Sequence, residues 1–129
     1  MPHRILLVED DTELRREILE YLRRRSHTVA DVGTSTEARN LLVQPATADE
    51  TFDVVLCDLN LGDGDGFDLF VECAPLHPSS HWILMSGDPD AERLEAAHHR
   101  LPGAPRCTIV SKPISLRNLA ALASAGPKM

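Results

Sequence analysis

The sequence has few aromatic residues, few cysteines and no long apolar run. Five of its 129 residues are aromatic, and its three cysteines, Cys57, Cys73 and Cys107, lie far apart. This pattern argues against a disulfide framework and for reduced thiols buried as small hydrophobic side chains. The apolar stretch near the N-terminus, Ile5 to Val8, is too short for a signal peptide or a membrane span. We therefore expect a cytoplasmic protein that makes no contact with a membrane.

Positive charge is scarce as well. The formal net charge is -7 at pH 7, which repels nucleic-acid phosphates and argues against direct nucleic-acid binding. The basic run Arg23 to Arg25 lies near the end of an expected helix, where the helix dipole favours cations. An apolar content of 43% suits one packed core. Because the last expected helix ends at Gly126 and Pro127, we expect one domain over residues 1–129 with no output domain attached.

Short apolar runs alternate with helical patterns along the chain, which is typical of βαβ units. The expected strands, all rich in Val, Ile or Leu, are Arg4 to Val8, Thr28 to Val32, Asp53 to Cys57, Trp82 to Met85 and Cys107 to Val110. Right-handed crossovers leave few topologies for five such units. We therefore expect an α/β, flavodoxin-like fold, a doubly wound five-stranded parallel sheet in the order 2-1-3-4-5 with helices on both faces.

Five helical segments are expected between and after these strands. They begin at Asp11 or Thr12, cover Thr34 to Val43, run from about Gly66 to Cys73 before Pro75, cover Asp90 to Arg100, and begin at Ser115. In the first, Leu14, Ile18 and Leu22 form one apolar stripe, and in the second Ala38, Leu41 and Leu42 are expected to face inward. Each helix should therefore pack one face on the sheet.

Polar residues follow the strands at the edge where open α/β sheets bind ligands. They are Glu9 and Asp10, Asp58 and Asn60, Ser86, and Lys112. Carboxylates about 4 Å apart repel one another by roughly 4 kcal/mol per pair at an effective dielectric near 20. Folding alone would not select that arrangement, but a divalent cation removes the conflict, and oxygen ligands favour Mg²⁺ over softer metals. The sequence thus predicts a magnesium site at this edge.

The same edge could accept a phosphoryl group. Its charge at Asp58 would be shared among Mg²⁺, the Ser86 hydroxyl and the Lys112 ammonium, which is electrostatic stabilisation of the transferring group. Asp58 would then be the nucleophile.

The segments that carry these residues resemble the receiver domain of bacterial two-component response regulators. They are Ile5 to Asp11, Val54 to Asn60, Asp65 and Gly66, Leu84 to Gly87, and Ser111 to Pro113. The resemblance implies that Asp58 takes a phosphoryl group from a sensor histidine kinase or a phosphotransfer protein. It also implies that Asp10, Asp58 and the Asn60 carbonyl hold Mg²⁺ and that Glu9 acts through water. The chain would be no enzyme beyond self-catalysed phosphotransfer and autodephosphorylation.

The family further implies a cis peptide between Lys112 and Pro113, and a Ser86 that turns toward the phosphate and biases a switch. The switch would control binding of a downstream protein target, with the chain a monomer or a weak phosphorylation-dependent dimer. Two features depart from the family pattern. Ile109 occupies a position that is often aromatic, and residues 61–66 lack the common proline, which predicts a more flexible and more acidic loop over the site.

These departures favour an alternative, a receiver-fold interaction module that signals without phosphorylation. A third class, a phosphatase or hydrolase that uses an aspartyl phosphate, needs a second Asp where this chain has Asn60. Four histidines have loosely ligand-like spacing but fall in or near expected loops away from the acidic edge, so we expect them to be solvated. They are His77, His81, His98 and His99.

Overall fold

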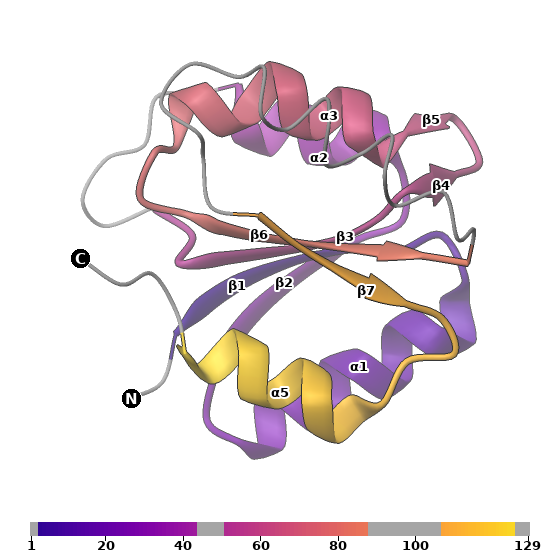
Figure 1. The fold of residues 1–129 in the computed structure, drawn as a ribbon, viewed down its shortest axis with the longest axis vertical. Coiled ribbons are helices and arrows are strands. Elements are labelled where there is room, and N and C mark those ends of the chain that lie inside the picture. The colour runs from indigo at the N-terminus through magenta and orange to yellow at the C-terminus, as the bar shows by residue number, and fades with distance from the viewer. Residues whose placement is uncertain (1–2, 44–50, 88–106, 126–129) are drawn as a thin grey trace.

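A five-stranded parallel sheet forms the centre of the molecule (Figure 1). The computed structural model describes residues 3–43, 51–87 and 107–125. The strands of the sheet are β1 (Arg4–Val8), β2 (Thr28–Val32), β3 (Val54–Asp58), β6 (His81–Ser86) and β7 (Cys107–Ser111). Their order is β2-β1-β3-β6-β7. This confirms the predicted 2-1-3-4-5 order, because the two short strands β4 and β5 come between the third and fourth strands of the sheet.

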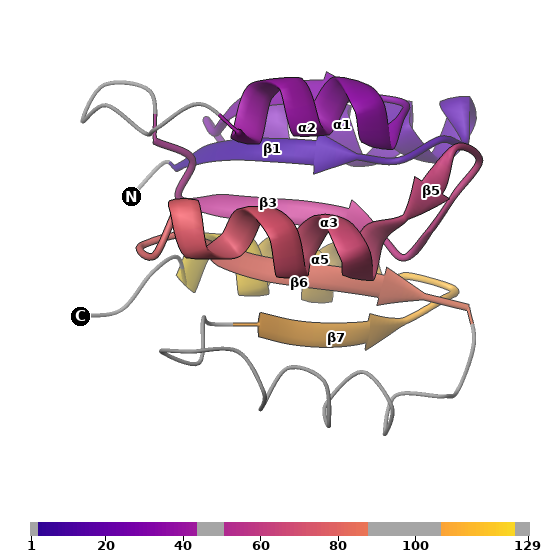
Figure 2. The ribbon, with the colours of Figure 1, turned by 90° about the horizontal axis from the view of Figure 1, so that it is seen from above.

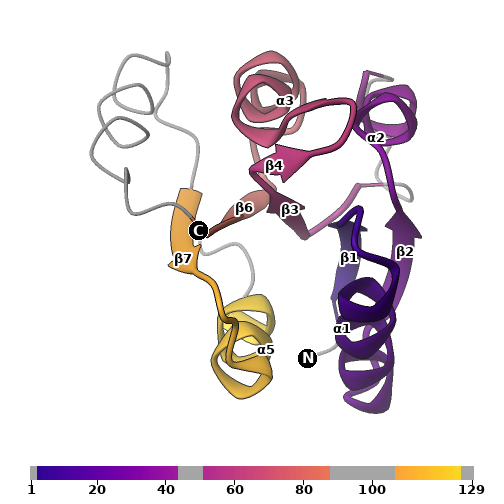
Figure 3. The same ribbon diagram turned by 90° about the vertical axis from the view of Figure 1, so that its right-hand side faces the viewer.

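Helices cover both faces of the sheet (Figures 1 and 3). On one face lie α1 (Thr12–Arg24) and α5 (Leu116–Ala125), and on the other lie α2 (Ser35–Leu42) and α3 (Gly66–Cys73), with the 3-10 turn η1 (Ala74–Leu76) after α3. The helix expected over Asp90 to Arg100 falls outside the described residues. Among the described helices, none is long and apolar enough to span a bilayer.

The core is divided in two by the sheet. Because successive side chains of a strand point to opposite faces, Ile5 and Leu7 pack with α1 and α5, whereas Leu6 and Val8 pack with α2 and α3. The side chains of β3 and β6 are buried on both faces, as expected for central strands of a parallel sheet. All three thiols are free, as predicted, and Cys57 and Cys73 are buried as expected, whereas Cys107 is only half-buried.

Three helices begin at a capping side chain close to the edge where the strands end. Asp11 accepts hydrogen bonds from the backbone N–H groups of Glu13 and Leu14, and Thr34 and Asp65 cap α2 and α3 in the same way. Each capping side chain gives a partner to backbone N–H groups that the helix itself leaves unpaired, and so fixes where the helix begins. The connections that carry the polar residues are therefore held by a cap at the point where each enters its helix.

Two expectations about side chains are wrong. Leu41 is 45% exposed, because the inward face of α2 runs through Ser35, Ala38 and Leu42. His77 and His81 are buried rather than solvated. His77 Nε2 lies 2.6 Å from the Leu42 carbonyl and His81 Nε2 lies 2.8 Å from Thr108 Oγ1, so each histidine joins neighbouring elements. His98 and His99 lie outside the described residues.

Candidate functional site

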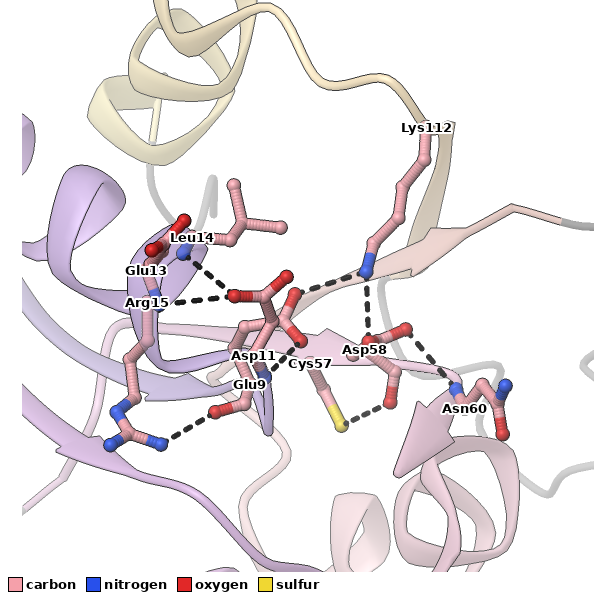
Figure 4. A network of polar contacts seen from close by, with 9 residues as sticks. All are labelled: Glu9, Asp11, Glu13, Leu14, Arg15, Cys57, Asp58, Asn60 and Lys112. Atoms are coloured by element: carbon pink, nitrogen blue, oxygen red, sulfur yellow. Dashed lines mark hydrogen bonds and ion pairs between the residues drawn. The ribbon is translucent and has the colours of Figure 1, made fainter. Parts of the chain in front are cut away.

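Glu9, Asp10 and Asp58 meet at the carboxyl end of β1 and β3 (Figure 4 shows Glu9 and Asp58). The register pairs Val8 with Cys57, so the residues that follow them, Glu9 and Asp58, leave the sheet side by side. One carboxylate oxygen from each of the three acids lies within 4.8 Å of the others. Glu9 is fully buried, Asp58 is 4% exposed, and Asp10 is exposed. The structure thus brings together the three predicted carboxylates.

Lys112 provides the positive charge of this cluster. Its Nζ lies 2.8 Å from Asp58 Oδ2 and 3.1 Å from Glu9 Oε1 (Figure 4). The residue follows β7, and its backbone N–H donates to the Ser86 carbonyl at 2.8 Å, which places it beside the end of β6. Burial lowers the pKa of Lys112, but its contacts with Asp58 and Glu9 outweigh that effect and raise the pKa overall. The ammonium is therefore charged at neutral pH.

The carboxylates are crowded beyond what this one ammonium neutralises. Burial, followed by a hydrogen bond to Asp58, raises the pKa of Glu9 to about 7 despite the opposing contact with Lys112. In the metal-free protein a proton therefore relieves the repulsion between Glu9 and Asp58 near neutral pH. A divalent cation would do the same without a proton.

The donor set fits Mg²⁺. Within the described part of the chain, Glu9, Asp10 and Asp58 form the sole cluster of three or more side chains able to hold a metal ion. All three offer hard oxygen atoms, and the exposed Asp10 leaves the cluster open to the water ligands that Mg²⁺ keeps. The Asn60 side chain points away from the acids (Figure 4), and its backbone N–H donates to Asp58 Oδ1 at 3.1 Å. Asn60 therefore contacts the site through its backbone.

The segment after Asp58 forms a hairpin that the sequence did not predict. Strands β4 (Asn60–Leu61) and β5 (Gly64–Asp65) pair in antiparallel fashion at the end of the sheet where β1 and β3 terminate (Figure 2). At the tip, Asp63 accepts hydrogen bonds from the backbone N–H groups of Ser35 at 2.8 Å and Thr36 at 3.2 Å. These bonds hold the pKa of Asp63 well below its usual range. The acidic loop is thus tied to α2.

Gly66 allows the hairpin to return close to β3, the strand that ends at Asp58. Its N–H donates to the Leu59 carbonyl at 2.9 Å, and a Cβ at this position would overlap the Asp58 backbone carbonyl. Only glycine permits this approach. The turn therefore holds the main chain directly after Asp58.

Ser86 and the residues around Lys112 lie where the sequence predicted. Asp58 pairs with Met85 of β6, so the buried Ser86 is the next residue along and lies at the end of the neighbouring strand. The Lys112–Pro113 peptide is cis, as expected. Ile109 is half-buried and packs in the same core cluster as Trp82.

One contact at the site was missed. The Arg15 guanidinium donates from Nη1 to the Glu9 carbonyl at 2.9 Å (Figure 4). The sequence signal was an arginine directly beside Leu14 in the inward-facing stripe of the first helix. That signal is weak, because an arginine at the border of an apolar stripe usually reaches solvent.

The fold and the site define a doubly wound α/β domain with an acidic cluster at its topological switch point. A family model described as the response regulator receiver domain matches residues 5–124. The chain belongs to this family.

Curated relatives are regulators and one sensor kinase. The chain is 32% identical over 117 residues to the regulatory protein VirG of Agrobacterium tumefaciens, covering 91% of this chain and 40% of VirG. It is 32% identical over 117 residues to the two-component response regulator ARR11 of Arabidopsis thaliana, covering 90% of this chain and 21% of ARR11. It is 28% identical over 116 residues to the sensor kinase CckA of Brucella abortus, covering 90% of this chain and 12% of CckA. The chain thus spans less than half the length of each.

Solved structures share the fold. A response regulator receiver domain from Clostridium thermocellum superposes with a TM-score of 0.79 at 20% identity, covering 95% of this chain and 92% of that one. A CheY-like receiver domain from Methanospirillum hungatei gives a TM-score of 0.77 at 22% identity, with 97% and 93% covered. The receiver fold predicted from the motifs is therefore confirmed.

Proposed function

We propose that this chain is a phosphoacceptor switch whose Asp58 takes a phosphoryl group from a phosphohistidine of a sensor histidine kinase or phosphotransfer protein. The observation that carries the proposal is the position of the Asp58 carboxylate, which contacts the Lys112 ammonium and lies within a cluster of hard oxygen donors. An ammonium beside the acceptor, and oxygen donors that can hold a metal cation next to it, are what phosphoryl transfer requires, since negative charge spreads over the transferring oxygens.

Each residue has a distinct task in the proposed reaction. An Asp58 oxygen forms the new bond to phosphorus while the bond from phosphorus to the imidazole nitrogen breaks, and the electron pair of that bond leaves with the imidazole. The Asn60 N–H and Lys112 Nζ hold the two Asp58 oxygens at 3.1 and 2.8 Å and so orient the carboxylate. Lys112 and the Ser86 hydroxyl then bind phosphoryl oxygens.

Glu9, Asp10, Asp58 and the Asn60 carbonyl would hold Mg²⁺, which supplies charge stabilisation to the phosphoryl oxygens when bound.

Loss of the phosphoryl group to water resets the switch, so the chemistry is self-catalysed phosphotransfer and autodephosphorylation. Asn60 stands where an aspartyl-phosphate hydrolase would need a second Asp. The proposed cytoplasmic protein binds a downstream protein target as a monomer or weak dimer, and it binds no nucleic acid directly. That residues 1–129 form one domain stays a prediction.

Incubation with acetyl phosphate and Mg²⁺, followed by intact mass spectrometry, tests the proposal. We expect the wild-type chain to gain one acid-labile phosphate and Asp58→Asn to gain none. Asp68→Asn is the matched control, because Asp68 is an exposed acid in the first turn of α3, and it should behave as the wild type. Omission of Mg²⁺ should abolish the gain.

Ile109 supports the second candidate, a receiver-fold interaction module that signals without phosphorylation. With an aliphatic side chain at this position, the Ser86 switch lacks the aromatic partner that many receivers use. If the wild type gains no phosphate, or if Asp58→Asn gains as much as the wild type, the interaction module is the better account.

A further inference from the structure

The turn from β1 to α1 carries Glu9 and Asp10, and Arg15 contacts the backbone on both sides of it. Arg15 Nη1 donates to the Glu9 carbonyl at 2.9 Å. The backbone N–H of the same residue donates to the Asp11 carbonyl, also at 2.9 Å. The two carbonyl groups that flank Asp10 are therefore both bound by Arg15.

The Glu9 carbonyl needs a partner from outside the sheet. The ladders that join β1 to β2 and to β3 both end at Val8. Beyond them, the Glu9 N–H still reaches the Val32 carbonyl at 3.1 Å, but its own carbonyl lies past the last paired residue. A backbone carbonyl beside a fully buried side chain costs free energy if it stays unpaired, so the guanidinium completes the end of the strand.

Two further residues hold the guanidinium in place. Asp31 Oδ2 of β2 lies 3.3 Å from Arg15 Nε. Gly33, two residues later, leaves the space that the guanidinium fills, since a Cβ there would overlap Arg15 Nη1. The planar fork of arginine contacts the Asp31 carboxylate through Nε and the Glu9 carbonyl through Nη1, so the two partners fix its orientation.

We infer that Arg15 is a positioning residue for the metal site, because it fixes the turn that holds Glu9 and Asp10 within reach of Asp58. The inference rests on the proposed function. Asp10 is exposed, so its carboxylate is positioned by its backbone more than by packing. Without the Arg15 contact, the turn can vary, and the three acids lose the spacing at which one small ion binds them all.

The direction in which metal affinity changes when Arg15 is removed distinguishes a positioning role from an effect of its charge. Arg15 is a cation near a site for a dication, so its charge alone weakens metal binding, and removing it would strengthen binding. A positioning role predicts the opposite result, weaker binding without Arg15. Partners outside the ligand set typically change metal affinity by 10- to 100-fold, and we expect a change of about tenfold here.

The test is a titration of each purified chain with Mn²⁺, in which free Mn²⁺ is counted by electron paramagnetic resonance and Mg²⁺ binding is measured by competition. Arg15→Ala should raise the Kd for both ions about tenfold. Arg16→Ala is the charge control, because Arg16 is exposed on the same helix, and its Kd should be unchanged or slightly lower.

A second pair of variants separates positioning from stability. Arg23→Ala removes a similar contact, Nη2 to the Val29 carbonyl at 3.3 Å, from the far end of α1. It should lower the urea midpoint of the metal-free chain without changing the Kd. Gly33→Ala keeps the Arg15 charge but displaces the guanidinium, and should raise the Kd even if Arg15→Ala does not fold.

The outcomes distinguish the inference from the function on which it rests. If the wild type binds neither ion, the proposed magnesium site is wrong. If the wild type binds and both Arg15→Ala and Gly33→Ala bind equally well, the metal site stands and the positioning role of Arg15 is overturned.

Discussion

Charged and polar groups are arranged differently at the two ends of the central sheet. At the carboxyl end, Glu9 and Asp58 lie buried side by side, and the Lys112 ammonium contacts both of them. At the amino end of the same two strands, polar groups meet complementary partners. The Arg4 N–H donates to Asp53 Oδ2 at 2.8 Å, and the His3 N–H donates to His27 Nδ1 at 2.9 Å.

Rings reinforce the amino end further. The His3 and His27 rings stack with centroids 5.8 Å apart, and the Arg4 guanidinium lies 4.9 Å from the centre of the Phe52 ring. Acidic side chains are thus crowded at one end, whereas the Asp53 carboxylate at the other end accepts a hydrogen bond from the backbone. Both ends belong to the same sheet. The contacts at the amino end can therefore hold the strands in register while the carboxyl end keeps two buried carboxylates side by side, which folding alone would not choose.

The largest effect should come from removing the ammonium of the carboxyl end. Lys112→Met leaves Glu9 and Asp58 buried without a cation, and we expect the metal-free chain to lose about 3 kcal/mol of unfolding free energy. Urea unfolding at pH 7.5 in a chelator measures it. Arg117→Met on the exposed side of α5 is the control and should change little. A Lys112 variant as stable as its control would mean that the two acids do not repel each other in the folded chain.

Much of the carboxyl end could be predicted from the sequence. Buried strands of a parallel sheet read as apolar runs, so the break after Val8 and the acid at Asp58 mark their ends directly. The hairpin could not be predicted in this way, because strands of two residues such as Asn60–Leu61 carry no periodicity. The contact between Arg15 and Glu9 was missed because the acceptor is a backbone carbonyl, which every residue has.

The burial of His77 and His81 and the exposure of Leu41 could not be predicted from the sequence either. His77 and His81 look like loop residues in the sequence, and their burial depends on where α2 and β7 pack. Leu41 looks apolar and inward, yet the helical period places Ala38 and Leu42 on the sheet instead. Residue type predicts which groups can be buried, and only the tertiary arrangement decides which of them are.

A smaller effect should appear as opposite responses of the two ends to pH. Burial raises the pKa of Glu9 to about 7, so the folded chain holds more protons than the unfolded chain between about pH 4.5 and 7. Acidification from pH 7 to 5 should therefore stabilise the metal-free chain through Glu9, by about 2 kcal/mol. Burial, with the nearby His3, lowers the pKa of His27, so His27 contributes stability that is lost as pH falls below about 6.5.

Urea unfolding of two variants between pH 5 and 8 separates these contributions. Glu9→Gln should remove the gain on acidification, and His27→Gln should remove the loss, each relative to the wild type. Mg²⁺ should abolish the Glu9 effect alone, because the cation takes the place of the proton. Identical pH slopes in both variants would show that the two ends do not differ in the way described.

The smallest effect concerns Asp63, an acid at the carboxyl end that is not crowded. Its carboxylate accepts hydrogen bonds from backbone N–H groups at the start of α2, where the helix dipole favours negative charge. Asp63→Asn should therefore lower stability slightly, whereas neutralising Glu9 should raise it above pH 7. Because the pKa of Asp63 is depressed, its contribution is present above the unfolded pKa near 4 and is lost as pH falls further. Thermal melts at pH 7.5 with Asp68→Asn as the exposed control measure the difference, and a rise in melting temperature for Asp63→Asn would place this acid among the crowded ones.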